Sequence, residues 1–210
     1  MTATPSPSAA SGTIRYVALG DSYTIGTSVD ESVRWPNQLV DRLAGKVNLQ
    51  LVANLGVNGY AAANLIRDEL PALDALRPDF VTVLIGVNDV VRATPADAYR
   101  ENMTQIFDFL LARVPANRIV VVSTPDYTRT PAGNSFGDPA QQSAAITQFN
   151  GIEQELAQSR GIAFVDISSV ANQVATDPTL VAGDGLHPSG AQYSGWVGLV
   201  GPVVEGLLAR

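Results

Sequence analysis

The amino-acid sequence predicts an α/β protein in which helices cover both faces of a five-stranded, parallel, doubly wound sheet. Two observations predict this class. Short apolar runs alternate with longer amphipathic stretches, and the apolar runs lack the apolar–polar alternation of a sheet with one wet face. Strands of this kind, separated by helices, form parallel sheets. The 210 residues fit a single domain of this size.

Five apolar runs are expected as the strands. Each is short, rich in Val, Ile, Leu or Phe, and bounded by polar or turn-forming residues. In chain order they are Ile14–Leu19, Leu49–Ala53, Phe80–Ile85, Ile119–Ser123 and Ile162–Ile167. Gly20 and Gly86 follow the first and third runs, which favours a tight turn at each point.

Amphipathic stretches between and after these strands are expected as helices. They are Trp35–Leu43, Ala61–Leu76, a helix that begins at Thr94 and Pro95 and extends to about Arg113, Ala140–Arg160, and a closing helix over Ser189–Leu208. The polar segment Thr124–Asp138 is longer than a simple connection requires, and loops of this length are often functional.

The composition excludes several kinds of chemistry. The chain has no cysteine and one histidine, His187, which rules out zinc ribbons, iron–sulfur clusters, thiol nucleophiles and HExxH metalloprotease motifs. Thirteen basic and twenty acidic residues give a net charge of −7, so nucleic acid and anionic lipid are not expected as partners. We expect neither a metal nor another cofactor.

The N-terminal residues 1–13 are rich in Pro, Ser, Ala and Thr and carry no charged side chain. They lack the basic start and apolar stretch of a signal peptide, so we expect a disordered lead before a single domain over residues 14–210. No stretch approaches the roughly 18 apolar residues that span a membrane. The absence of cysteine slightly favours the cytoplasm, and a processed, secreted protein is the alternative. The oligomeric state is not determined by the sequence.

Four short segments that follow expected strands carry residues suited to catalysis. In chain order they are Gly20-Asp21-Ser22-Tyr23, Gly56-Val57-Asn58-Gly59-Tyr60, Gly86-Val87-Asn88-Asp89 and Asp184-Gly185-Leu186-His187-Pro188. Each segment alone fits an ordinary cap, turn or surface residue. Because doubly wound proteins bind ligands at the carboxyl ends of their strands, the four together favour a catalytic site.

The four segments offer complementary chemistry. Ser22 lies in a strand-to-helix turn that can present its hydroxyl as a nucleophile, and the Asn88 amide is a donor suited to an oxyanion. A glycine in the second segment lets a backbone N–H approach a ligand oxygen closely. The three-residue spacing of Asp184 and His187 lets the carboxylate accept a hydrogen bond from Nδ1–H, which leaves Nε2 free as a base.

In this order and at these separations, the segments resemble the sequence blocks of the SGNH hydrolases, also called the GDSL esterase/lipase family. The resemblance extends from about Arg15 to the C-terminus, and the first block reads GDSY where the family name implies leucine. It implies a flavodoxin-like three-layer α/β/α sandwich, which would make residues 14–210 a catalytic domain. It also implies metal-free ester hydrolysis through an acyl-enzyme intermediate.

The resemblance assigns a role to each site residue. Ser22 is the nucleophile, His187 the general base and Asp184 the carboxylate that orients it. The oxyanion is held by the backbone N–H groups of Ser22 and Gly59 and by the Asn88 side chain. Gly59 is preferred to Gly56 because Gly59-Tyr60, followed by small residues, matches the family's glycine–aromatic pattern. Asp21 is expected to brace the turn and to take no part in the chemistry.

The leading interpretation is therefore a serine esterase that hydrolyses small or short-acyl carboxylic esters. An acyltransferase that uses the same acyl-enzyme is an alternative, and so is a non-catalytic doubly wound module that binds a ligand or signals. The second alternative lacks a glycine-rich phosphate loop, and the only lysine, Lys46, is expected at the opposite end of the sheet. Candidate substrate-lining residues are Tyr23, Tyr60, Asp126, Tyr127 and Arg129, for which packing or solvated roles are the competing interpretation.

Overall fold

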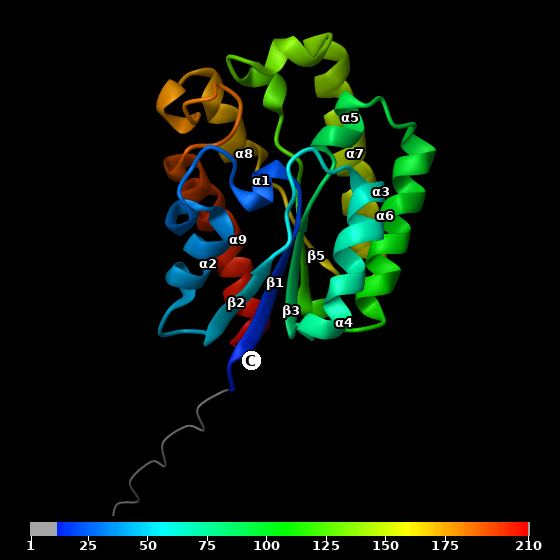
Figure 1. The fold of residues 1–210 in the computed structure, drawn as a ribbon, viewed down its shortest axis with the longest axis vertical. Helices are drawn as coiled ribbons and strands as arrows, with labels where there is room; N and C mark the ends of the chain where they lie inside the picture. Colours follow the sequence, from blue (N-terminus) through cyan, green and yellow to red (C-terminus); the bar gives the residue numbers. More distant parts are fainter. Residues whose placement is uncertain (1–11, 210) are drawn as a thin grey trace, which may run out of the picture.

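A five-stranded parallel sheet forms the centre of the protein (Figure 1). The computed structural model describes residues 12–209, so most of the lead expected over residues 1–13 lies outside the described residues. The strands are β1 (Ile14–Gly20), β2 (Leu49–Asn54), β3 (Phe80–Leu84), β4 (Ile119–Val122) and β5 (Ala163–Val165). They pair in parallel in the order β2-β1-β3-β4-β5, which confirms the predicted doubly wound sheet.

The strand order creates a crevice at the carboxyl edge of the sheet. From β1 the chain crosses to β2 on one side and then returns to β3 on the other. The connections after β1 and β3 therefore leave in opposite directions, and ligands of doubly wound proteins bind where the connections diverge. Gly20 pairs with Leu84, so β1 and β3 end side by side at this point.

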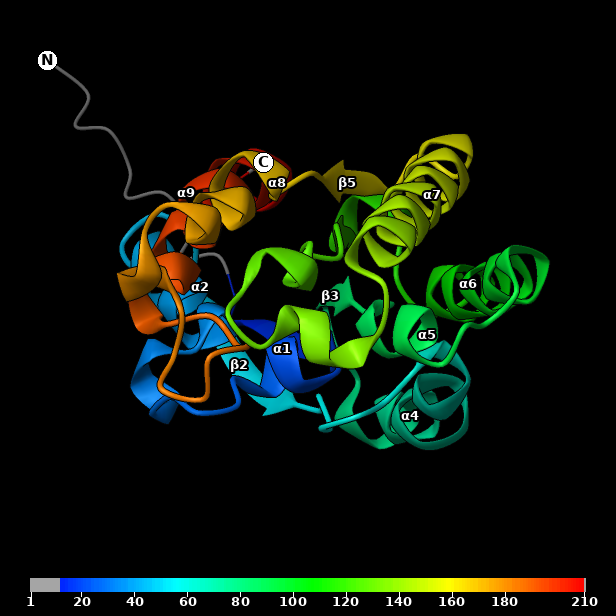
Figure 2. The same ribbon diagram turned by 90° about the horizontal axis from the view of Figure 1, so that it is seen from above.

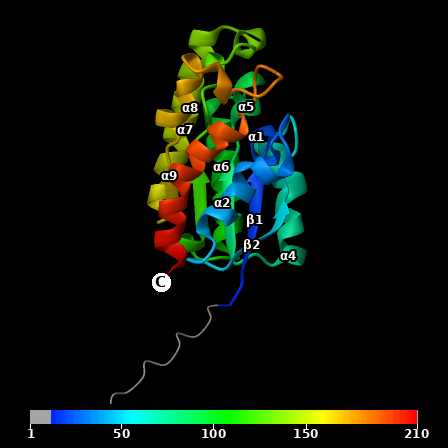
Figure 3. The same ribbon diagram turned by 90° about the vertical axis from the view of Figure 1, so that its left-hand side faces the viewer.

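Helices cover both faces of the sheet and complete a three-layer α/β/α sandwich (Figure 2). One layer contains α2 (Trp35–Leu43) and α9 (Gly190–Leu208), which pack against each other (Figure 3). The other contains α6 (Ala96–Leu111) and α7 (Pro139–Ser159). The amphipathic patterns place these helices correctly because their apolar stripes face the sheet; in α2, for example, Trp35, Leu39 and Leu43 are buried.

Shorter helices lie at the ends of the strands and at the sheet margin. They are α1 (Ser22–Ile25), α3 (Ala62–Asn64), α4 (Leu73–Leu76), α5 (Val87–Val91) and α8 (Ser168–Ala171). Of these, α1 follows β1 and α5 follows β3, so two of the four candidate segments are helical turns at the carboxyl edge. Lys46 precedes β2 at the opposite end of the sheet, as expected, and pairs with Glu205.

The prediction of a single helix over Ala61–Leu76 is wrong. The structure has α3, a π-helical turn over Leu65–Glu69, a 3₁₀ turn over Leu70–Ala72, and α4. Pro71 has no N–H to continue an α-helical ladder, which ends the preceding turn. The π turn directs Glu69 inward, where its Oε2 accepts a hydrogen bond from the Gly20 N–H (2.9 Å).

Two further element boundaries differ from the prediction. Pro95, and not Thr94, occupies the N-cap of α6, because the Thr94 N–H donates to the Asp89 carbonyl and belongs to the preceding turn. The expected strand Ile162–Ile167 is reduced to β5. Ile162 donates to the Ala157 carbonyl at the end of α7, and Ile167 has the non-extended backbone of the residue that precedes α8.

Candidate active site

The turn between β1 and α1 positions Ser22. Gly20 adopts φ 150°, and a Cβ there would overlap the carbonyl oxygen of Leu84, so the turn requires glycine. Asp21 caps α1 by accepting a hydrogen bond from the Tyr23 N–H (2.9 Å). Ser22 is the first residue of α1 and lines a pocket at the crevice. Asp21 therefore braces this turn, in agreement with the expectation from the sequence.

The loop before α9 brings Asp184 and His187 together. Asp184 Oδ2 lies 2.6 Å from His187 Nδ1, which is the contact that the spacing of the two residues predicts. Asp184 Oδ1 accepts hydrogen bonds from the backbone N–H groups of Leu186 and His187, each at 2.9 Å. Gly185 supplies the positive φ of 75° that this tight turn needs. The carboxylate is thus fixed by its own loop.

A fourth donor reaches Asp184 from a distant part of the chain. Ser28 Oγ donates to Asp184 Oδ2 at 2.6 Å and links the α1–α2 connection to the histidine loop. Partial burial by itself would raise the pKa of Asp184. The hydrogen bonds from Ser28, from the His187 ring and from the backbone of Leu186 and His187 outweigh this effect, so the pKa lies well below its usual range. Asp184 is consequently ionised throughout the neutral range.

The opposite side of the crevice carries Gly59 and Asn88. Gly59 adopts φ 79° in the turn closed by the hydrogen bond from the Tyr60 N–H to the Val57 carbonyl. The Arg92 side chain donates to the Gly59 carbonyl (2.6 Å) and anchors this turn. Neither the Gly59 N–H nor the Ser22 N–H donates to a backbone carbonyl of residues 12–209. Both groups are therefore available to a ligand oxygen.

Asn88 lies in α5, one turn after β3, and its amide serves the same crevice. One Nδ2 hydrogen bond goes to the Tyr60 carbonyl (2.9 Å), and a second, long contact reaches Asp21 Oδ2 (3.4 Å). The long contact is weak, so the second N–H remains largely free to donate to a bound oxygen. Asn88 thus ties the Gly59–Tyr60 segment to the serine turn.

A pocket of about 180 Å³ unites the predicted residues. Ser22, Gly59, Asn88 and His187 all line it, and Asp184 supports His187 from behind. The structure therefore brings together every residue assigned to catalysis from the sequence. The remaining lining is mostly apolar and comprises Tyr23, Asn58, Val87, Val91, Tyr127, Phe136 and Leu186.

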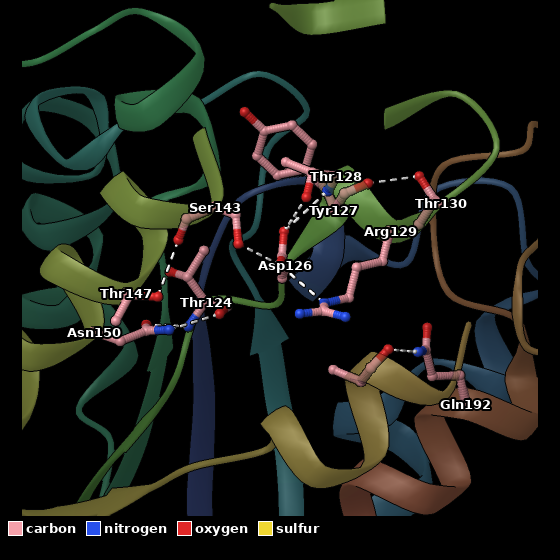
Figure 4. A network of polar contacts seen from close by, with 11 residues as sticks. Thr124, Asp126, Tyr127, Thr128, Arg129, Thr130, Ser143, Thr147, Asn150 and Gln192 are labelled. Atoms are coloured by element: carbon pink, nitrogen blue, oxygen red, sulfur yellow. Dashed lines mark hydrogen bonds and ion pairs between the residues drawn. The ribbon is translucent and has the colours of Figure 1, made fainter. Parts of the chain in front are cut away.

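Tyr23 and Tyr127 line the pocket, whereas Tyr60, Asp126 and Arg129 do not. Tyr60 contributes its backbone carbonyl to Asn88. The Asp126 carboxylate is occupied in holding its own loop: it accepts hydrogen bonds from Thr128, from Ser143 on α7 and from Arg129 (Figure 4). The hydrogen bond from Ser143 to Asp126 thus holds the loop against α7.

The segment Thr124–Asp138 shapes the pocket through a residue that the sequence did not single out. Two 3₁₀ turns, Tyr127–Arg129 and Gly133–Phe136, fold the segment across the carboxyl edge of the sheet (Figure 2). Phe136 contacts Tyr127 edge-on, with ring centroids 6.0 Å apart, and remains 40% exposed at the pocket mouth. An aromatic residue within a long polar segment was the available signal for this position in the sequence.

Carboxyl groups are buried beneath the serine turn. Burial raises the pKa of Glu69 to about 9, against the hydrogen bond from Gly20 that lowers it. Burial and the nearby charge of Asp89 raise the pKa of Asp21 to about 7, although the Tyr23 N–H opposes the shift. Glu69 therefore keeps its proton at neutral pH and supports the turn as a neutral side chain.

Within residues 12–209, no group of three or more His, Asp or Glu side chains is arranged to hold a metal ion. The helices of this part of the chain are also too short or too polar to cross a membrane.

The fold and the pocket together define a class of protein. It is a three-layer α/β sandwich in which serine, histidine, asparagine and glycine groups meet at the carboxyl edge, with an aspartate behind the histidine. Residues 18–194 match the GDSL-like Lipase/Acylhydrolase family, and this match covers most of the chain. The protein belongs to this family, as its sequence segments indicated.

Similar proteins include several esterases. A multidomain esterase of Ruminococcus flavefaciens is 26% identical over 90% of this chain, and an acetylxylan esterase of Geobacillus stearothermophilus is 26% identical over 68% of it. The chain spans only 28% and 66% of these two relatives. An arylesterase of Vibrio mimicus is 25% identical over 83% of the chain and 80% of the relative.

Solved structures share the fold. TesA superimposes with a TM-score of 0.73 at 19% identity, covering 92% of this chain and 99% of TesA. The acetylxylan esterase Axe2 of G. stearothermophilus gives a TM-score of 0.72 at 20% identity, covering 91% of this chain and 94% of Axe2. These likenesses confirm the three-layer architecture expected from the sequence.

Proposed function

We propose that the protein is a serine esterase that hydrolyses short-acyl carboxylic esters through an acyl-enzyme, with residues 14–210 as its catalytic unit. The observation that carries this proposal is the Asp184–His187 pair at 2.6 Å beside a pocket that also contains Ser22. A carboxylate that accepts the Nδ1–H fixes the histidine tautomer and leaves Nε2 as the base. The esterase names of the relatives agree with this activity.

The reaction divides into two halves. His187 Nε2 takes the proton of the Ser22 hydroxyl as the oxygen attacks the ester carbonyl carbon. The resulting oxyanion accepts hydrogen bonds from the Ser22 and Gly59 N–H groups and from the Asn88 amide. When the tetrahedral intermediate collapses, the protonated His187 gives its proton to the departing alkoxide. Water, deprotonated by His187, then attacks the carbonyl carbon of the acyl-serine. As the bond to the Ser22 oxygen breaks, the protonated His187 returns its proton to that oxygen and the acid is released.

The pocket dimensions favour a short acyl group. Its volume of about 180 Å³ lies below the roughly 300–1,000 Å³ of sites for drug-sized ligands, which favours an acyl group of a few carbons. Val87, Val91 and Phe136 give it apolar walls. The name of the G. stearothermophilus relative, an acetylxylan esterase, is consistent with a small acyl group.

Labelling with a fluorophosphonate, followed by mass mapping, tests the nucleophile. We expect one adduct on Ser22, none in Ser22→Ala, and normal labelling in the matched variant Ser123→Ala, whose hydroxyl is buried between β4 and β5 and away from the pocket. Parallel assays with p-nitrophenyl esters of increasing chain length should show activity falling beyond short acyl groups. An adduct on another serine, or an active preparation that takes no label, would overturn the assignment.

A further inference from the structure

The residue that follows Ser22 contacts the histidine of the pocket. The rings of Tyr23 and His187 lie with their centroids 5.2 Å apart, and their planes are inclined at 54°. Both residues line the pocket, although they are far apart in the sequence. Figure 2 shows the loop before α9 (orange) passing beside α1 (blue). Tyr23 therefore connects the serine turn directly to the residue proposed as the base.

Tyr23 occupies the position at which the family name implies leucine. Leucine would supply apolar bulk there, but it has no π face. The phenol hydroxyl does not explain the tyrosine, since it is buried and has no hydrogen-bond partner among residues 12–209. Burial raises the pKa of Tyr23 well above its usual range, so the ring stays uncharged at neutral pH. The feature that distinguishes Tyr23 from leucine in this site is thus the aromatic ring itself.

Several contacts hold the Tyr23 ring in place. The Tyr23 N–H donates to Asp21 Oδ1 (2.9 Å), and the Tyr23 carbonyl accepts a hydrogen bond from the Tyr193 hydroxyl (2.9 Å). The ring stacks against Trp196, with centroids 6.4 Å apart and an interplanar angle of 18°. Trp196 in turn meets Tyr193 edge-on, and both belong to α9. Tyr23 is consequently a rigid, buried support.

The His187 ring needs such a support. Its Nδ1 is held by Asp184 at 2.6 Å, but one hydrogen bond at one edge leaves the ring free to tilt about that contact. A rigid side chain packed against the ring limits the tilt, and Tyr23 is placed to do so. Because Tyr23 directly follows Ser22 in α1, the same contact fixes the base relative to the nucleophile.

The contact also acts on the charge that develops during the reaction. In each half of the proposed mechanism His187 takes up a proton and becomes an imidazolium. The face of an aromatic ring carries partial negative charge and attracts a cation that lies within about 6 Å of its centroid. The His187 ring lies inside this distance, and its side chain is only 12% exposed, so solvent screens the attraction little. The Tyr23 ring therefore stabilises the charged form of the base.

We propose that Tyr23 is a positioning residue for catalysis: its ring holds the His187 imidazole beside the serine turn and stabilises the imidazolium that forms when Ser22 or water gives up its proton. The proposal rests on the esterase function proposed above. It predicts that an aromatic ring is required at this position, that the phenol hydroxyl is dispensable, and that an apolar side chain without a π face does not replace it.

Two variants separate the ring from the hydroxyl. Tyr23→Phe keeps the ring and removes only the unpartnered hydroxyl, whereas Tyr23→Leu removes the ring and keeps an apolar side chain. The measurements are kcat and KM for p-nitrophenyl acetate. We expect Tyr23→Leu to lower kcat roughly 5- to 30-fold, because the lost attraction belongs to the charged base. KM should stay within twofold, since substrate binding does not depend on that charge. Tyr23→Phe should keep kcat within twofold of the wild-type value.

Tyr16→Leu is the matched control. Tyr16 lies in β1, is fully buried and contacts Phe80 with almost the same geometry, at a centroid distance of 5.3 Å and an angle of 45°. It does not line the pocket. The substitution also removes the hydrogen bond between Tyr16 and Thr82 (2.8 Å), so it is the harsher structural change. It should lower the stability toward urea and leave kcat within twofold.

NMR of the imidazole tests the contact itself, without reference to activity or to the folding of a variant. His187 is the only histidine of the chain, so its ring protons are identified without ambiguity. We expect nuclear Overhauser effects between these protons and the ring of Tyr23 in the wild-type chain, and the same effects in Tyr23→Phe. Their absence from the wild-type chain would overturn the proposal.

The outcomes separate the two proposals. A loss of kcat smaller than fivefold in Tyr23→Leu, an equal loss in Tyr23→Phe, or an effect on KM alone overturns the positioning role and leaves the esterase function standing. A loss of kcat in Tyr16→Leu as large as in Tyr23→Leu also overturns it, since a loosened core would then explain both. A wild-type chain that does not cleave p-nitrophenyl acetate overturns the esterase function itself.

Discussion

Replacing Asn88 by alanine separates a catalytic role for this residue from a structural one. In the resting structure its amide makes one normal hydrogen bond, to the Tyr60 carbonyl at 2.9 Å, and one long contact with Asp21 at 3.4 Å. Losing a normal hydrogen bond lowers the free energy of unfolding by about 1 kcal/mol. Losing an oxyanion donor raises the activation barrier by about 2.7–4 kcal/mol, or roughly 10²–10³ in kcat.

The two effects differ enough to be distinguished. A protein with a typical stability of about 5–15 kcal/mol remains almost entirely folded after a loss of about 1 kcal/mol. A structural role alone would therefore leave kcat within a few-fold of the wild-type value. We expect Asn88→Ala to lower kcat on p-nitrophenyl acetate by roughly 10²–10³ while urea denaturation reports a loss of about 1 kcal/mol.

Asn64→Ala is the matched control for this experiment. Asn64 Oδ1 accepts hydrogen bonds from the Ala61 N–H (3.1 Å) and from Arg92 (2.9 Å), so it ties the same segment of the chain without lining the pocket. Its loss should lower stability by a similar amount and change kcat only a few-fold. If Asn88→Ala retains more than about a tenth of the wild-type kcat, or if both variants lose the same activity, the oxyanion role of Asn88 is refuted.

Three further variants test the site and its support. His187→Ala should lower kcat by about 10⁴-fold or more, since no second histidine can replace it; retention of a tenth of the activity would contradict its role as base. Ser28→Ala should lower kcat less than about tenfold, because Asp184 keeps three other donors. Asp184→Asn should lower kcat by orders of magnitude. Equal losses of kcat in the two variants would mean that the carboxylate acts mainly through Ser28 and not by orienting His187. Glu69 holds its proton to about pH 9 in the fold but loses it near 4.5 when unfolded, so the free energy of unfolding should fall with rising pH between these values. Glu69→Gln should remove up to about 1.4 kcal/mol per pH unit from that slope in urea denaturation at pH 5 to 8, and an unchanged slope would contradict the buried neutral carboxyl.

The strands and the main helices follow from local patterns in the sequence. Phe80–Leu84 and Ile119–Val122 are fully buried strands, and their uniform apolar character is what a parallel sheet covered on both faces requires. The helix over residues 61–76 was mispredicted because apolar spacing cannot show that Glu69 turns inward to meet Gly20. The π turn depends on this contact between residues that are distant in the sequence.

The core of the site was equally predictable. Ser22, Asn88 and the Asp184–His187 pair follow strands or lie in a loop of the same edge, and parallel pairing brings the carboxyl ends of the strands together. The hydrogen bond between Asp184 and His187 is local, since three residues separate them. The sequence by itself therefore determined which residues meet, because each step depends on local spacing or on the geometry common to all parallel sheets.

Only the tertiary structure decided what surrounds that core. Ser28 reaches Asp184 across 156 positions of the chain, and Phe136 reaches the pocket because its loop folds over the sheet edge. Asp126 lies in the same loop, but its carboxylate accepts a hydrogen bond from Ser143 and holds the loop in place. Such contacts depend on how loops of irregular backbone pack. The hydrophobic periodicity of the sequence does not predict that packing. The sequence determined which residues meet in the pocket, and the packing of the loops decided which side chains surround them.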